Sequence, residues 1–168
     1  MGSEYGNEWV SQIASVLVCE IIQSMSGIEL EPCPEQSMDY DDVDAVYGLV
    51  DGDYCLQLQF KADRALFFRL ARNMIGGEPE DLAEVEEYAV EFFNVLCGRF
   101  ISEVYRTTHA AARFHPTRYE EDPHVTVLRD REAVEKICFI SDKGERAAFL
   151  WTTLSIEKLL RRSIHVNA

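Results

Sequence analysis

Residues 81–110 read DLAEVEEYAVEFFNVLCGRFISEVYRTTHA and carry a long helical pattern. At about 100° per residue, the large apolar side chains fall on one side of a helix that runs from Asp81 to roughly Ala110. These apolar residues are Phe93, Leu96, Cys97, Phe100 and Val104. A narrow sector on the opposite side, called the polar stripe below, consists of Glu87, Glu91, Asn94, Gly98 and Ser102. The pattern therefore predicts a helix with one apolar face for a core and one polar face.

Glu91 and Asn94 lie one helical turn apart on the polar stripe, so their side chains point the same way. A carboxylate and a carboxamide in that arrangement can together hold a charged partner and a water molecule. Most such pairs are only solvated residues on an exposed helix, but three local features favour a function here. Gly98 in a helix interior costs about 1 kcal/mol relative to alanine, which suits a stripe that a partner approaches. Phe92 and Val95 are expected to border the stripe and offer apolar contact area, and Asn94 is a mediocre helix former.

The rest of the chain alternates helical and extended patterns. Helical spacing recurs at 7–26 and 62–75. Extended patterns cover 28–32, 45–50, 54–61, 113–120, 124–128, 136–141 and 146–153. Turn residues at 51–53 and 142–144 predict two hairpins, and 155–162 fits either a short helix or a last strand. This order predicts one α+β domain over 1–168, with helices packed on an antiparallel sheet.

Composition limits the class of protein. The chain has 168 residues, 47% of them hydrophobic, which suffices for one domain to bury its own core without disulfides or a metal. The formal net charge of -14 argues against nucleic acid or an anionic membrane as a partner, because those are held by Lys and Arg. The N-terminus lacks a signal pattern and no stretch approaches a membrane span, so we expect a cytoplasmic protein.

Many enzyme signatures are missing from the sequence. It has no phosphate-binding glycine loop, no nucleophile elbow and no His-Glu-x-x-His zinc motif. None of the five cysteines is followed six positions later by arginine, as a cysteine-dependent phosphatase would require, so reduced structural thiols are expected. His115 with His124 is a weak metal pattern, and the acidic residues between Glu35 and Asp44 are expected to form a solvated loop. We predict no covalent mechanism and no metal site of the chain's own.

A family resemblance rests on the run EYAVEFFNVLCG, which begins at Glu87, together with ARNMIG at 71–76 and Pro116. These residues resemble the CheX branch of the CheC/CheX/FliY chemotaxis phosphatases. The motif of that family is Asp or Ser, then Glu four positions later, Asn three positions after that, and a more distant Pro. Glu91 and Asn94 match it, Glu87 stands in place of the usual Asp or Ser, and the gap to Pro116 is one residue shorter. The resemblance implies an α+β fold of the CheC/CheX type.

The activity that the resemblance implies is dephosphorylation of a CheY-type response regulator in two-component chemotaxis signalling. The acyl phosphate and its Mg²⁺ would belong to the regulator, and the chain would need no cofactor or nucleophile of its own. Asn94 would orient the attacking water and Glu91 would pair with the regulator's active-site lysine, which is catalysis by positioning. A homodimer is also implied. The expected partner contacts are Glu87, Phe92, Val95, Gly98 and Ser102.

Three further hypotheses concern the same chain. Glu20 and Gln23 repeat the spacing of Glu91 and Asn94 and could form a second site, although Val16 stands where the motif has its first polar residue. A non-catalytic module could dock on a regulator or on flagellar-switch components without hydrolysis, but the carboxamide of Asn94 favours the enzyme. A purely structural acidic protein would bind no phosphorylated receiver domain.

Overall fold

The computed structural model describes residues 2–35, 42–121 and 134–152. These residues form three helices and a seven-stranded antiparallel sheet, which confirms the predicted α+β class. The helices are α1 (Gly2–Ser26), α2 (Arg64–Ile75) and α3 (Leu82–Thr108). The strands are β1 (Leu30–Cys33), β2 (Val43–Gly52), β3 (Leu56–Asp63), β4 (Ala112–Phe114), β5 (Arg118–Glu120), β6 (Val134–Ser141) and β7 (Arg146–Thr152). The patterns at 124–128 and 155–162 lie outside the described residues.

The sheet has the strand order β1-β6-β7-β3-β2-β4, and β5 also pairs with β2. Every neighbouring pair is antiparallel. Both predicted hairpins are confirmed, because β2 pairs with β3 from Val50 and Leu56 onward, and β6 pairs with β7 up to Ile140 and Arg146. The two hairpins join where β3 pairs with β7, so segments far apart in the sequence share the centre of the sheet.

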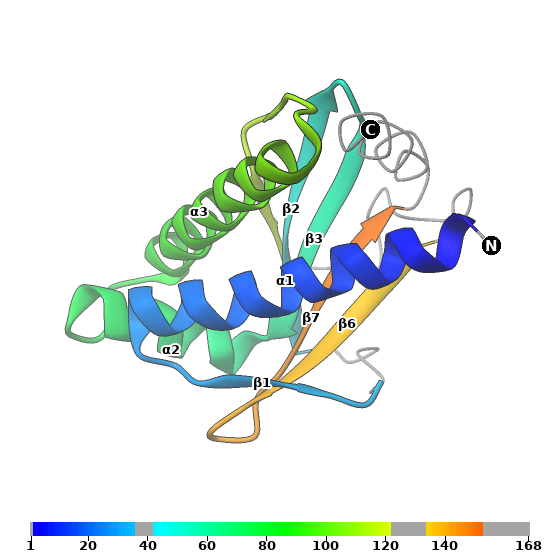
Figure 1. Cartoon of the computed structure of the whole chain (residues 1–168). Helices are drawn as coiled ribbons and strands as arrows, with labels where there is room; N and C mark the ends of the chain where they lie inside the picture. Colours follow the sequence, from blue (N-terminus) through cyan, green and yellow to red (C-terminus); the bar gives the residue numbers. More distant parts are fainter. Residues whose placement is uncertain (1, 36–41, 122–133, 153–168) are drawn as a thin grey trace.

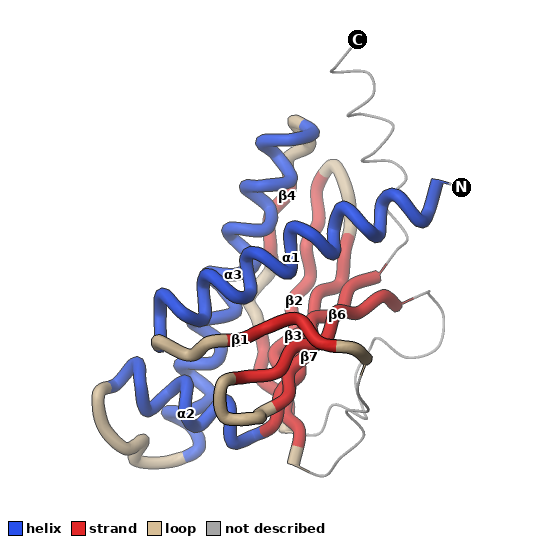
Figure 2. Tube along the Cα trace, turned by 60° about the horizontal axis from the view of Figure 1, so that its bottom comes forward, coloured by secondary structure: helices blue, strands red, loops and turns tan. Residues whose placement is uncertain are grey.

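The three helices supply a second layer. Figure 1 shows α1 crossing in front of the sheet and α3 running beside β2, and α1 is still in front of the strands in the turned view of Figure 2. α3 contacts β2, β4 and β5, α2 contacts β3, and α1 contacts β1 and β6, while each helix also contacts the other two. One core fills the space between the layers. Its largest fully buried side chains include Phe60, Phe92, Phe100, Phe149 and Trp151.

Local sequence determines where α2 and α3 begin and end. Asp81 precedes α3, and its carboxylate accepts a hydrogen bond of 2.9 Å from the backbone N–H of Glu84, which caps the helix start. Gly76 follows α2 with φ 79°, a left-handed conformation that glycine adopts without a Cβ clash. α2 begins at Arg64 rather than at the predicted Ala62, because Ala62 is part of β3.

α1 begins at Gly2, ahead of the predicted start at residue 7, and ends at the predicted Ser26. Gly27 follows it with φ 72° and donates its N–H to Gln23 O at 2.8 Å, which confirms the predicted end of the helix. The buried face of α1 consists of Val10, Ala14, Leu17, Val18, Ile21 and Ile22. Within the described part of the chain, no helix combines the length and the apolar character that crossing a membrane needs.

Candidate functional site on helix α3

The polar stripe lies on the outer side of α3, as predicted. Glu87, Glu91 and Ser102 are exposed, while Asn94 and Gly98 are half-buried. The five predicted core residues of this helix all have 0% of their surface exposed. The Glu91 carboxylate is therefore in solvent, and the Asn94 carboxamide lies one turn further on at the edge of the core.

Phe92 is not at the surface, so its expected role as a partner contact is wrong. Its side chain is 0% exposed, and its ring packs edge-on against Phe60 with the ring centroids 5.2 Å apart. The reason is that α3 contacts the sheet and both other helices, so its buried arc is wider than the helical pattern alone predicts. Val95 is 39% exposed and offers apolar surface beside the stripe.

The carboxamide of Asn94 has a hydrogen-bond partner inside the chain. Thr117 Oγ1 donates to Asn94 Oδ1 at 2.8 Å. Thr117 follows Pro116 between β4 and β5 and is only 9% exposed. A carboxamide oxygen has a second lone pair and the amide has two N–H donors, so Asn94 can still hold a further group. Sequence reasoning missed Thr117, and its one signal was its position directly after the proline of the motif.

The carboxylate of Glu91 takes part in none of the ion pairs formed among the described residues. Another acid on the same helix differs, because Glu103 pairs with Arg106 at 2.7 Å. An exposed carboxylate without an internal cation can pair with a cation that a partner brings. Glu91 is thus suited to binding from outside rather than to holding the fold together.

The described neighbours of Gly98 give no packing reason for a glycine. A Cβ atom built at Gly98 would meet Phe114 Cε1 at 3.7 Å, which is ordinary van der Waals contact. The Ser102 hydroxyl donates to Gly98 O at 2.9 Å and so is turned back onto its own helix. The stripe therefore exposes bare backbone next to Asn94, at a position where alanine would make the helix more stable.

Glu20 and Gln23 are exposed on α1, and Val16 beside them is 55% exposed. α1 lies against α3, and Val16, Glu20 and Arg99 help to line a groove between the two helices. Glu20 Oε2 lies 3.9 Å from Arg99 Nη2. This pair is accessible, but Glu20 already has a cation beside it, which distinguishes it from Glu91.

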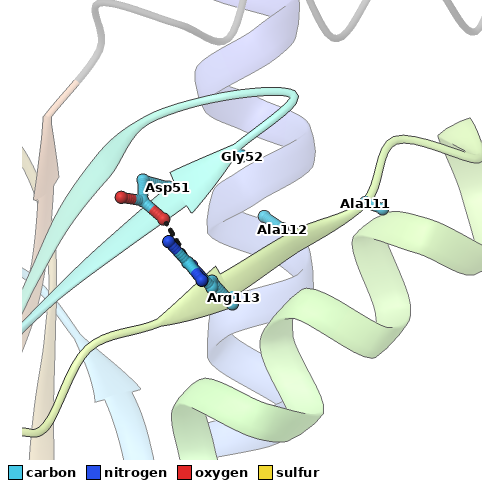
Figure 3. Close-up of a pocket in the computed structure, with 5 residues that line it drawn as sticks. All are labelled: Asp51, Gly52, Ala111, Ala112 and Arg113. Carbon is cyan, nitrogen blue, oxygen red and sulfur yellow. Dashed lines mark hydrogen bonds and ion pairs between the residues drawn. The ribbon is translucent and has the colours of Figure 1, made fainter.

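A separate pocket lies at the end of the β2-β4 pair, and no residue of the polar stripe lines it (Figure 3). The lining residues are Asp51, Gly52, Ala111, Ala112 and Arg113. Figure 3 shows Asp51 and Arg113 reaching toward each other, with Oδ1 and Nε 3.3 Å apart. The hydrogen bond between His115 and Asp51 lowers the pKa of Asp51 below its ordinary value. These polar groups satisfy one another and tie β4 to β2.

Two other residues from groups that the sequence singled out, Cys97 and Asp44, are buried parts of the fold. His124 lies outside the described residues, and within the described residues no three His, Cys, Asp or Glu side chains form a possible metal site. Burial raises the pKa of the Cys97 thiol to about 12, so it is not a nucleophile at neutral pH.

The expectation of a solvated acidic loop is wrong for Asp44, which is 0% exposed and accepts two hydrogen bonds of 3.0 Å from Arg64. Asp44 holds β2 to the start of α2.

Comparison with solved structures identifies the class of fold. No family model and no curated protein matches the sequence. The chemotaxis protein CheX from Desulfovibrio desulfuricans matches with a TM-score of 0.70 over 84% of this chain and 97% of that one, at 15% identity. A chain of the CheX-CheY-BeF3-Mg complex from Borrelia burgdorferi matches with a TM-score of 0.69 over 84% and 95%, at 12% identity. FliY from Thermotoga maritima matches with a TM-score of 0.70 over 98% and 96%, at 14% identity.

These matches define an α+β fold with helices on one antiparallel sheet. More particularly, the chain has the fold of CheX, CheC-like and FliY proteins, which confirms the fold that the resemblance implied. A shared fold does not carry an activity with it. An activity therefore depends on the residues of the site, which here are Glu91 and Asn94.

Proposed function

We propose that this chain is a CheX-like member of the CheC/CheX/FliY family that accelerates dephosphorylation of a CheY-type response regulator in chemotaxis signalling. The observation that carries the proposal is the outward placement of Glu91 and Asn94, one turn apart on α3. The CheX fold, and the presence of a CheX-CheY complex among the similar structures, support it.

The proposed reaction is hydrolysis of an acyl phosphate on the regulator. A water oxygen bonds to phosphorus, the bond from phosphorus to the aspartyl oxygen breaks, and the products are the regulator's aspartate and inorganic phosphate. Asn94 would hold the water in line with the breaking bond. This is rate acceleration by positioning, which dominates phosphoryl transfer. Mg²⁺ held by the regulator would neutralise the developing charge, so the chain would need no metal of its own.

Glu91 would dock the regulator by pairing with its active-site lysine. The carboxylate is exposed, so it needs no rearrangement within the described chain to accept that cation. Val95 would supply apolar contact, and the bare backbone at Gly98 would allow close approach. Glu87 and Ser102, both exposed, would lie at the two ends of the contact. The net charge of -14 would add long-range attraction to a basic partner surface.

The proposal is tested by phosphate release. Receiver domains from the same genome are phosphorylated with a small phosphodonor, and their decay is followed with and without catalytic amounts of the chain. At least one should decay faster. Glu91→Lys should weaken binding of that regulator by placing like charges together, whereas Glu29→Lys, the same charge change in an exposed loop, should not. Unchanged decay for every receiver domain would contradict the proposal.

A second candidate is docking without hydrolysis. The match to the FliM middle domain from H. pylori favours it, with a TM-score of 0.66 over 95% of this chain and 97% of that one at 9% identity, because the same fold then serves a protein outside the CheC/CheX/FliY family. Such a module would bind the phosphorylated regulator and leave its decay rate unchanged. Docking alone does not require the carboxamide at position 94, which is why the phosphatase is proposed first.

We also propose that the chain is a homodimer in the cytoplasm, where a CheY-type substrate would be found. Among the described strands β1 lies at one end of the sheet order and pairs with β6 alone, so its outer edge can receive a second copy. α3 packs at the other end, on β2, β4 and β5, which would leave the polar stripe accessible. Light scattering should give twice the chain mass of 19.2 kDa, and a monomer mass would contradict the dimer.

A further inference from the structure

The backbone places one extra residue in the segment that carries Thr117. β2 pairs with β4 through Val50 and Phe114 and with β5 through Tyr47 and Arg118. Between those pairs, residues 48–49 of β2 face residues 115–117, so three residues oppose two. Such a bulge redirects a side chain relative to a regular strand. Proline at 116 suits the break, because it has no N–H to donate to the ladder.

The methyl group of Thr117 is packed between β2 and α3. A Cβ atom built at Gly48 would lie 3.2 Å from Thr117 Cγ2 and 3.2 Å from Phe93 Cε1, closer than most side-chain contacts. Glycine at 48 therefore makes room for the threonine methyl. β-branched side chains have few χ1 rotamers, so packing of the methyl also fixes the direction of Oγ1.

The fixed hydroxyl points at Asn94. Thr117 is 9% exposed, and a hydroxyl at that depth needs a hydrogen-bond partner, which Asn94 Oδ1 provides at 2.8 Å. The terminal torsion of asparagine is otherwise broad, with no steep energy minimum. Because one lone pair of Oδ1 is held by Thr117, the directions of the second lone pair and of both amide N–H groups are defined.

We infer that Thr117 is a positioning residue, which orients the Asn94 carboxamide before the phosphorylated regulator binds. The inference rests on the proposed function of Asn94, because the oriented amide is the group that would hold the attacking water. Thr117 itself touches neither water nor phosphate in this account. Its effect should therefore fall on the chemical step and not on complex formation.

Three substitutions separate the hydroxyl from the methyl. Thr117→Ser keeps only the hydroxyl, Thr117→Val keeps only the methyl, and Thr117→Ala keeps neither. Regulator dephosphorylation is measured for each at saturating and limiting regulator, with thermal unfolding as a check on the fold. Thr117→Val and Thr117→Ala should lower kcat by about 10- to 100-fold with KM nearly unchanged. Thr117→Ser should fall between these variants and the parent, because it keeps the hydroxyl but lacks the methyl that fixes its direction.

The opposite pattern would overturn the inference, because high activity in Thr117→Val and low activity in Thr117→Ser would show that packing alone matters. If one variant fails to fold, the side-chain amide NMR signals of Asn94 in the others still test orientation, and they should change in every folded variant that lacks the hydroxyl. Substitution of Thr117 in an Asn94→Ala background separates the role of Thr117 from the role of Asn94. Thr117→Val should have no further effect on the rate there. A parent rate in Asn94→Ala itself would refute the proposed function, whereas unchanged Asn94 amide signals in Thr117→Val would refute orientation of the amide by Thr117.

Discussion

The ring of Phe92 packs edge-on against the ring of Phe60, with centroids 5.2 Å apart and ring planes at 70°. Phe60 lies in β3, between β2 and β7, so this contact joins α3 to the middle of the sheet. It also limits rotation of α3 about its axis. Since Glu91 and Asn94 flank this part of the helix, the packing of the core determines the direction in which both point.

Phe92→Ala should lower the free energy of unfolding by about 3–5 kcal/mol, the usual range for deleting a buried aromatic ring. Denaturant unfolding measures the change. Val95→Ala is the matched control for stability. Val95 is 39% exposed, so its replacement should change the free energy of unfolding by no more than about 0.5 kcal/mol. Similar small losses for both variants would place Phe92 at the surface after all.

Gly98→Ala should have opposite effects on stability and binding. The free energy of unfolding should rise by up to about 1 kcal/mol, because alanine is the better helix former and its Cβ has room beside Phe114. The added methyl should weaken regulator binding if a partner approaches the stripe closely. Thermal unfolding and titration measure the two effects. Gly77→Ala is the control, because this glycine lies at an open position outside the helices, and it should leave binding unchanged. Unaltered regulator binding in Gly98→Ala would show that no partner approaches the backbone of the stripe closely.

The hairpins and the long helix could be predicted because their signals are local. Alternation, turn residues and three- to four-residue spacing all act within a short window of sequence. The strand order could not be predicted, since it depends on distant pairs such as Phe60 with Phe149. The exposure of Phe92 was predicted wrongly for the same reason, because the surfaces that cover it come from other parts of the chain.

Only part of the candidate site could be predicted from the sequence, for the same reason. Glu91 and Asn94 were found because helical spacing places them together. Thr117 was missed because its contact with Asn94 depends on how β5 pairs with β2 and on the packing of α3. Asp44 looked like one more acid in an acidic stretch, and only the fold places Arg64 against it at 3.0 Å.

Asp142 should make stability depend on pH. Its hydrogen bond from Arg69, with Nη2 and Oδ1 2.7 Å apart, lowers the pKa of Asp142 in the folded protein. A lowered folded-state pKa stabilises the fold above the ordinary aspartate value of about 3.9 and loses that contribution as the pH falls through the folded value. Asp142→Asn should therefore be less stable than the parent at pH 7, and the difference should shrink in acid. Urea unfolding across that range measures it, and a constant difference would contradict the assignment.

Asn94→Ala tests whether the carboxamide accelerates hydrolysis. The acceleration of regulator dephosphorylation should fall by about 100-fold or more, as when an oriented transition-state donor is removed, while affinity for the phosphorylated regulator changes little. Asn73→Ala is the matched control, because it removes a carboxamide from the exposed side of α2, where Nδ2 donates to Ser26 O at 2.8 Å. That control should hydrolyse at the parent rate. A folded Asn94→Ala protein that also hydrolyses at the parent rate would contradict the phosphatase account and leave docking without hydrolysis in its place.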